Sequence, residues 1–70
     1  MFVLTDYTVK PPYIYNKNDI KDVADIVVGI TGNEKEGDKV VMFCEDMHFR
    51  DTHISRLGYV IDCVRDEEVT

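Results

Sequence analysis

The chain has few of the residues that cross-link small proteins or bind polyanions. Only two of its 70 residues are cysteine, which is too few for the disulfide scaffold of a secreted domain. Eight lysine and arginine residues stand against fourteen aspartate and glutamate residues, and the formal net charge is -6. Phosphate binding needs a cationic surface, so this composition argues against nucleic acid or an anionic membrane as the direct ligand.

Long hydrophobic runs are also missing. The apolar opening of residues 1–4 meets Thr5 and Asp6 at once, so it is shorter than the core of a signal peptide. No segment approaches the length of a transmembrane helix. We therefore expect a cytoplasmic protein whose two cysteines stay reduced.

Catalytic motifs are absent as well. The chain has no glycine-rich phosphate loop, and nothing around its only serine, Ser55, resembles a nucleophile elbow. Asp46, His48, Asp51 and His53 have the side chains for acid–base work or cation binding, but a solvated polar loop explains them better. We predict a protein that is not an enzyme and has no cofactor.

The length and composition predict one small acidic domain over residues 1–70. The hydrophobic fraction of 44% is ordinary for a folded protein. A chain of this length buries only about 60% of the surface that its unfolded form exposes, so association with a partner or with itself would add needed stability. The last few residues, which include Asp66, Glu67 and Glu68, predict a frayed acidic tail.

One segment, residues 18–32, has the apolar spacing of a helix. Its apolar residues recur at the i, i+3, i+4, i+7 spacing of a buried stripe: Ile20, Val23, Ala24, Val27 and Ile30. Asn18 is a good N-cap residue, and Gly32 with Asn33 supplies the stop. We predict a helix here that packs on a sheet.

The segments on either side of this helix predict a strand and two connections. Residues 1–9 have the alternation of a β-strand, and Pro11 and Pro12 cannot donate ladder hydrogen bonds, so the strand ends before them. Residues 13–15 form a short aromatic bridge into the helix. Residues 33–39 are polar and predict an exposed connection.

The second half of the chain predicts two more strands. Residues 39–45 are apolar on both faces, which is typical of a central strand. Residues 46–56 predict an extension of this strand through Phe49 and then a loop, with a helical turn at 52–57 as the alternative. Residues 57–65 alternate again and predict the last strand.

These elements give a β-α-β-β domain of the α+β class, with a three-stranded, mainly antiparallel sheet and one helix packed on one face. If Cys44 faces Cys63, the two mainly apolar sets of these strands stay on separate faces, so parity predicts that facing residue numbers have an odd sum near roughly 105 to 109 and that both cysteines share one face. One helix covers one face, which leaves Phe43, Val60 and Val64 as a predicted interface. The alternative is that the N-terminal segment or residues 13–15 fold across that face.

The cysteines and histidines contain the ligand atoms that zinc prefers. Cys44, His48, His53 and Cys63 have the spacing C-x3-H-x4-H-x9-C, which does not match the usual paired knuckles. Buried core cysteines and exposed loop histidines are the favoured interpretation, and the four residues remain weak metal candidates.

The acidic and aromatic residues predict a protein-binding surface. Tyrosine is favoured at interfaces, and exposed carboxylates steer a protein toward a basic patch. The alternative is that the carboxylates only keep the chain in solution and that the tyrosines belong to the sheet. The candidates for partner contact are Asp19, Asp22, Asp25, Glu45, Asp46, Asp51, Asp66, Glu67, Glu68, Tyr13 and Tyr15.

In size, negative charge and lack of a catalytic motif, the chain is similar to the small acidic inhibitors of phages and mobile elements that block host defence nucleases such as CRISPR effectors. This likeness of class implies a viral or mobile-element inhibitor that mimics nucleic acid and occludes a larger basic partner, possible targets being nucleic-acid enzymes. The alternative function is a structural or regulatory homo-oligomer, such as a homodimer, that pairs through an uncovered sheet face.

Overall fold

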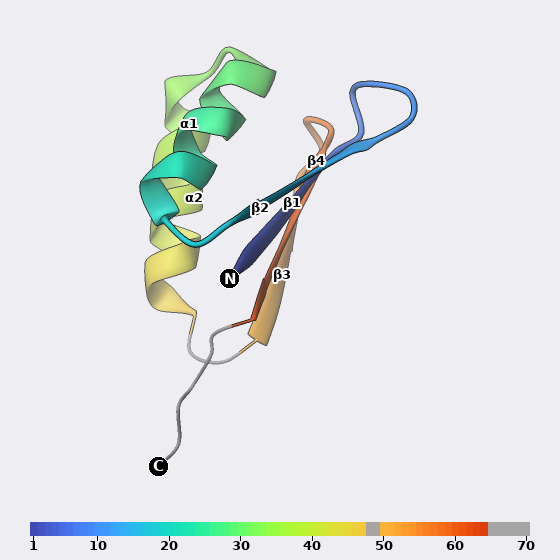
Figure 1. The fold of residues 1–70 in the computed structure, drawn as a ribbon. Coiled ribbons are helices and arrows are strands. Elements are labelled where there is room, and N and C mark those ends of the chain that lie inside the picture. The colour runs from blue at the N-terminus through green and yellow to red at the C-terminus, as the bar shows by residue number, and fades with distance from the viewer. Residues whose placement is uncertain (48–49, 65–70) are drawn as a thin grey trace.

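The computed structural model describes residues 1–47 and 50–64 and shows an α+β fold (Figure 1). Its elements follow the order β1 (Phe2–Asp6), β2 (Tyr13–Lys17), α1 (Ile20–Thr31), α2 (Glu34–Asp46), β3 (Arg50–Ile54) and β4 (Tyr59–Val64). The described strands form one antiparallel sheet in the order β2-β1-β4-β3. The predicted class is confirmed, whereas the prediction of three strands and one helix is wrong.

The sheet has a helix-facing side set by the alternation of its two central strands. Leu4 of β1 lies opposite Tyr15 of β2 and Ile61 of β4. Along β4, Tyr59, Ile61 and Cys63 are buried and alternate with less buried residues, so the strand predicted near the end of the chain is present. These residues and the buried stripes of both helices form the core.

Helix α1 confirms the prediction for residues 18–32, with one change at its start. The N-cap is Asp19 and not Asn18, because the Asp19 side chain accepts a hydrogen bond from the backbone N–H of Lys21 at 2.9 Å. Gly32 ends the helix in the left-handed conformation, with φ of 67°.

Helix α2 replaces both the exposed connection and the central strand predicted for residues 33–45. Asn33 caps it by accepting from the backbone N–H of Lys35. Val40 and Cys44 are buried, but Met42 between them is 63% exposed. In a strand Met42 would share the face of Val40 and Cys44, whereas in a helix it points away from them, so this burial pattern fits a helix and not a strand.

Three further predictions are corrected. Residues 13–15 belong to an edge strand of the sheet and are not a bridge. Strand β3 replaces the predicted loop and helical turn, and the extension through Phe49 lies outside the described residues. Cys44 does not face Cys63 across two strands, because Cys44 is in a helix; β4 pairs with β3 instead, with Arg50 opposite Val64.

Both helices lie on the same side of the sheet (Figure 1). No described helix covers the other side, and β2, once predicted as a possible cover, is part of the sheet. Strand alternation places five apolar residues on this uncovered side. Three of them are exposed, namely Ile14, Ile54 and Val64, and two are half-buried, namely Val3 and Val60. The predicted interface residues Val60 and Val64 lie here. Phe43 does not, because it is on α2 and packs against the core.

Candidate functional site

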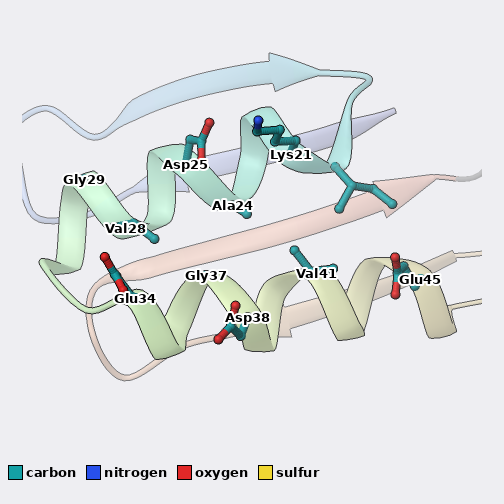
Figure 2. A pocket seen from close by; sticks show the side chains of 11 residues that line it. Lys21, Ala24, Asp25, Val28, Gly29, Glu34, Gly37, Asp38, Val41 and Glu45 are labelled. Carbon is teal, nitrogen blue, oxygen red and sulfur yellow. The ribbon is translucent and has the colours of Figure 1, made fainter.

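A groove of about 840 Å³ runs between α1 and α2. The helices form an antiparallel pair, so that Gly29 and Glu34 lie at one end of the groove and Lys21 and Glu45 at the other (Figure 2). Small and apolar side chains make up its floor: Ile20, Ala24, Val28, Gly37 and Val41. The groove is therefore an apolar trough built only from helical residues.

Gly37 sets the close approach of the two helices. A Cβ atom added there would lie 2.6 Å from the Val28 Cγ2 atom and 3.4 Å from the Ala24 carbonyl oxygen. Glycine in a helix costs about 1 kcal/mol relative to alanine, and here close packing offsets that cost. The helices consequently meet without a bulky ridge between them.

The rim of the groove is acidic. Asp25 from α1 and Glu34, Asp38 and Glu45 from α2 line it, and Lys21 is the one cation among the lining residues. The single ion pair within residues 1–47 and 50–64 joins Lys39 to Glu36, so none of the four rim carboxylates forms an ion pair with a described cation. The groove thus combines an apolar floor with a rim of four carboxylates and one lysine, which is net negative.

A second polar cluster lies between α2 and the sheet. The Tyr59 hydroxyl donates a buried hydrogen bond of 2.6 Å to Glu36 Oε1, and Lys39 Nζ lies 3.4 Å from Glu36 Oε2. The ring of His53 lies between those of Phe43 and Tyr59, with centroid separations of 5.3 Å and 5.9 Å. Both oxygens of the buried carboxylate therefore already have partners.

These contacts shift the pKa values of Glu36 and Tyr59. The hydrogen bond from Tyr59 lowers the pKa of Glu36, although burial opposes this, and the Lys39 ammonium lowers it further. Burial, together with the Glu36 hydrogen bond, raises the pKa of Tyr59 well above its ordinary value. Glu36 stays ionised and Tyr59 stays neutral near pH 7, which suits a structural link between α2 and β4.

A hollow of about 330 Å³ adjoins this cluster and is lined partly by Glu36, Lys39 and His53. Its remaining lining comes from Ile54 at the end of β3 and from residues 55–57 in the β3–β4 connection. Since Glu36 is occupied by Tyr59 and Lys39, we assign the cluster to stability and take the groove as the candidate site.

Of the acidic residues predicted from the sequence, the structure brings two into the groove. Asp25 and Glu45 line it from opposite helices. Asp22 and Asp46 are exposed on the same helices but do not line it, and Asp19 is used as the N-cap of α1.

The other predicted contact residues lie elsewhere. Asp51 is on β3, where it accepts a hydrogen bond from the Thr52 backbone N–H. Tyr13 and Tyr15 pack edge to face on the edge strand β2, with ring centroids 4.7 Å apart. Residues 66–68 lie outside the described part of the chain.

Three of the four weak metal candidates lie on described elements. Cys44 is buried in α2, Cys63 is buried in β4, and His53 is half-buried on β3. His48 lies outside the described residues. Within residues 1–47 and 50–64, no group of three or more His, Cys, Asp or Glu side chains is placed to hold a metal ion.

Sequence reasoning missed Glu34 and Asp38 because it treated residues 33–39 as a connection. The signal was present: Glu34, Asp38 and Glu45 recur at helical spacing after Asn33, which is a good N-cap residue. Reading that cap would have placed the three carboxylates on one helix face.

Comparisons with protein families, with curated proteins and with solved structures found no match to this chain. In the described part of the chain, neither helix has the length and apolar character needed to cross a membrane. Inference about function therefore rests on the geometry of the chain itself.

Proposed function

We propose that this chain is a non-enzymatic protein-binding module that docks on a larger basic protein through the groove between α1 and α2. The observation that carries the proposal is the pairing of an apolar floor with a net negative rim, whose four carboxylates form no ion pair with a described cation. Apolar contact supplies affinity, and charge complementarity supplies orientation and a fast association rate.

The charge of the whole chain supports a basic protein as the partner. The net charge of -6 repels nucleic acid and anionic membranes but attracts a cationic protein surface. A partner that itself binds nucleic acid presents such a surface. As part of the proposal, the chain acts in the cytoplasm as an inhibitor of phage or mobile-element origin and occludes that surface, as anti-CRISPR-like proteins do.

Two matched variants test groove docking. Asp25→Asn with Asp38→Asn removes one carboxylate from each wall of the groove, whereas Asp22→Asn with Asp46→Asn removes one from each helix outside it. The unmodified chain and each variant are immobilised and used to capture partners from the native lysate at low and high salt. The captured protein is identified, purified and titrated directly.

We expect the groove variant to weaken binding of the purified basic partner about tenfold, a change of roughly 1.4 kcal/mol, and the outer variant to change it much less. Raising the salt concentration should reduce the difference, because salt screens exposed charges. Equal affinity of all three proteins at every salt concentration would overturn docking through the groove.

The inhibitor part of the proposal has its own measurement. The purified partner is mixed with its nucleic acid, and the chain is added in increasing amounts. Competitive displacement supports occlusion of the nucleic-acid surface. A stable ternary complex with undiminished nucleic-acid affinity would contradict occlusion and leave the docking itself intact.

A second candidate function is supported by the uncovered side of the sheet. Ile54 is 74% exposed there and Ile14 is 55% exposed, which is unusual for large apolar side chains on a small domain. We propose self-association through this side as the alternative function.

A further inference from the structure

We infer that the occupant of the groove is a single amphipathic α-helix of about three turns, with lysine or arginine beside a narrow apolar stripe. This inference rests on the proposed function and specifies its partner. Four features of the groove support it: the origin of its walls, its length, its charge and one glycine.

The walls favour a helix over an extended segment. Every lining residue belongs to α1 or α2, whose backbone groups are largely used in their own helical hydrogen bonds. An extended peptide on the apolar floor would find no strand edge for its N–H and C=O groups, and burying them without partners is costly. A helix satisfies these groups internally and packs its side-chain ridge between two helices.

The length of the groove sets the length of the occupant. Its lining runs along α2 from Glu34 to Glu45 (Figure 2). At a rise of 1.5 Å per residue this is about 16 Å, or roughly three helical turns. A helix of that length places cations on one side along the whole row of carboxylates.

Two of the carboxylates that line the groove, Asp38 and Glu45, occupy locally unfavourable positions in the chain by itself. Glu34 and Asp38 form a like-charge i, i+4 pair, which destabilises a helix. Glu45 lies in the last turn of α2, where the helix dipole disfavours anions and no basic residue compensates. Lysine or arginine side chains of a bound helix would reduce the repulsion between Glu34 and Asp38 and would also compensate the charge of Glu45.

Gly29 is the fourth feature. It is exposed inside α1, and a Cβ atom added there would meet nothing within 4 Å. The packing of this chain therefore does not require glycine, although glycine lowers helix stability relative to alanine. Since Gly29 lines the groove, it leaves room for the backbone of an incoming helix.

The test uses displayed peptide libraries of about fourteen residues, a length that covers the three turns. One library fixes a helix-forming frame with randomised positions, and the other carries the same frame with a central proline that breaks the helix. Selection is against the full chain. The selected peptides are then synthesised and titrated against Gly29→Ala, Gly29→Leu and Lys35→Leu, the last of which adds a leucine to α2 outside the groove lining.

We expect enrichment only from the helix-forming library, with lysine and arginine beside apolar residues spaced i, i+3 or i+4, and i+7. Gly29→Leu should weaken binding about tenfold or more, Gly29→Ala should weaken it less, and Lys35→Leu should leave it within about twofold. Thermal unfolding should show both Gly29 variants to be more stable than the unmodified chain, so a loss of binding is not a loss of fold.

Enrichment from the proline library, or full affinity for Gly29→Leu, would overturn the helical occupant. In that case, if Asp25→Asn with Asp38→Asn still weakens binding of the captured partner, the proposed docking function stands and only the helical nature of the occupant is wrong. If helical peptides bind the groove as expected but binding of no captured partner depends on the groove, the proposed function fails. The preference of the groove for a basic amphipathic helix still stands.

Discussion

Gly29 and Gly37 are both helical glycines, but their surroundings are opposite. A Cβ atom at Gly37 would collide with Val28, which is β-branched and stiff, whereas one at Gly29 would enter open space. The same substitution should therefore have opposite effects at the two positions.

We expect Gly29→Ala to raise the free energy of unfolding by about 0.5 to 1 kcal/mol, because alanine is the better helix former. Gly37→Ala should lower it by about 1 to 2 kcal/mol, because overpacking of the helix contact exceeds the gain in propensity. Denaturant unfolding of both variants measures this. Stabilisation by both would mean that the helices do not pack as closely at Gly37 as described.

Glu36 and Tyr59 link stability to pH from both sides. The folded state lowers the pKa of Glu36 from its usual 4.5, so this contribution is present above that pH and is lost as pH falls through the lower folded value. The folded state raises the pKa of Tyr59 from its usual 10, so this contribution is complete below pH 10 and is lost as pH rises further.

Tyr59→Phe should lower the free energy of unfolding by about 1 to 3 kcal/mol at pH 7, because a buried carboxylate oxygen loses its donor. The difference from the unmodified chain should narrow below pH 4.5 and above pH 10, since Glu36 is neutralised at one end and Tyr59 ionises at the other. Chemical unfolding across pH checks this.

Tyr13→Phe is the matched control, because Tyr13 is 58% exposed at the sheet edge. It should change the free energy of unfolding by no more than about 0.5 kcal/mol at each pH. A Tyr59→Phe effect that stays constant from acid to neutral pH would contradict the ionic link to Glu36.

At the scale of elements, the two helices differed in how well they could be predicted. Helix α1 has apolar residues at helical spacing along its whole length, and capping residues mark both of its ends. The spacing and the caps therefore predict the same helix. Helix α2 begins with a polar turn, and its apolar residues are concentrated at 40–44, where a continuous apolar run imitates a central strand. Its polar first turns depend on tertiary packing, which buries Glu36 and Gly37 against the rest of the fold.

Strand β2 and the candidate site were missed for related reasons. Residues 13–17 have one mainly exposed face and become a strand by pairing with β1, which the local sequence does not reveal. The groove needs both helices, so a missed α2 removed half of its walls. Asp25 and Glu45 were still named, because exposed carboxylates are recognisable without knowing their neighbours.

The described residues form a helix layer and a sheet layer (Figure 1). They present two unlike surfaces, the acidic groove between the helices and the uncovered side of the sheet. Self-association through the sheet is testable with a matched pair of exposed residues. Ile54 is 74% exposed on β3, and Met42 is 63% exposed on α2. Neither substitution should unfold the domain, since exposed positions tolerate change.

For the alternative function, we expect Ile54→Lys to lower the association constant of the chain about tenfold or more, because it buries a charge in the contact, and Met42→Lys to leave it unchanged. Analytical ultracentrifugation over a range of concentrations measures both. An unmodified chain that stays monomeric throughout, or equal effects of the two variants, would contradict association through the sheet.

By itself, the sequence determined the α+β class, helix α1, the last strand and the strong negative charge, because each depends on local spacing or on composition. Only the tertiary structure decided that residues 34–46 form a helix, that Glu36 is buried against Tyr59, and that four carboxylates surround one groove. The physical reason is that positions four residues apart share a face in a helix and in a strand alike. Packing against the sheet selects between them, and only packing brings charges from separate segments together.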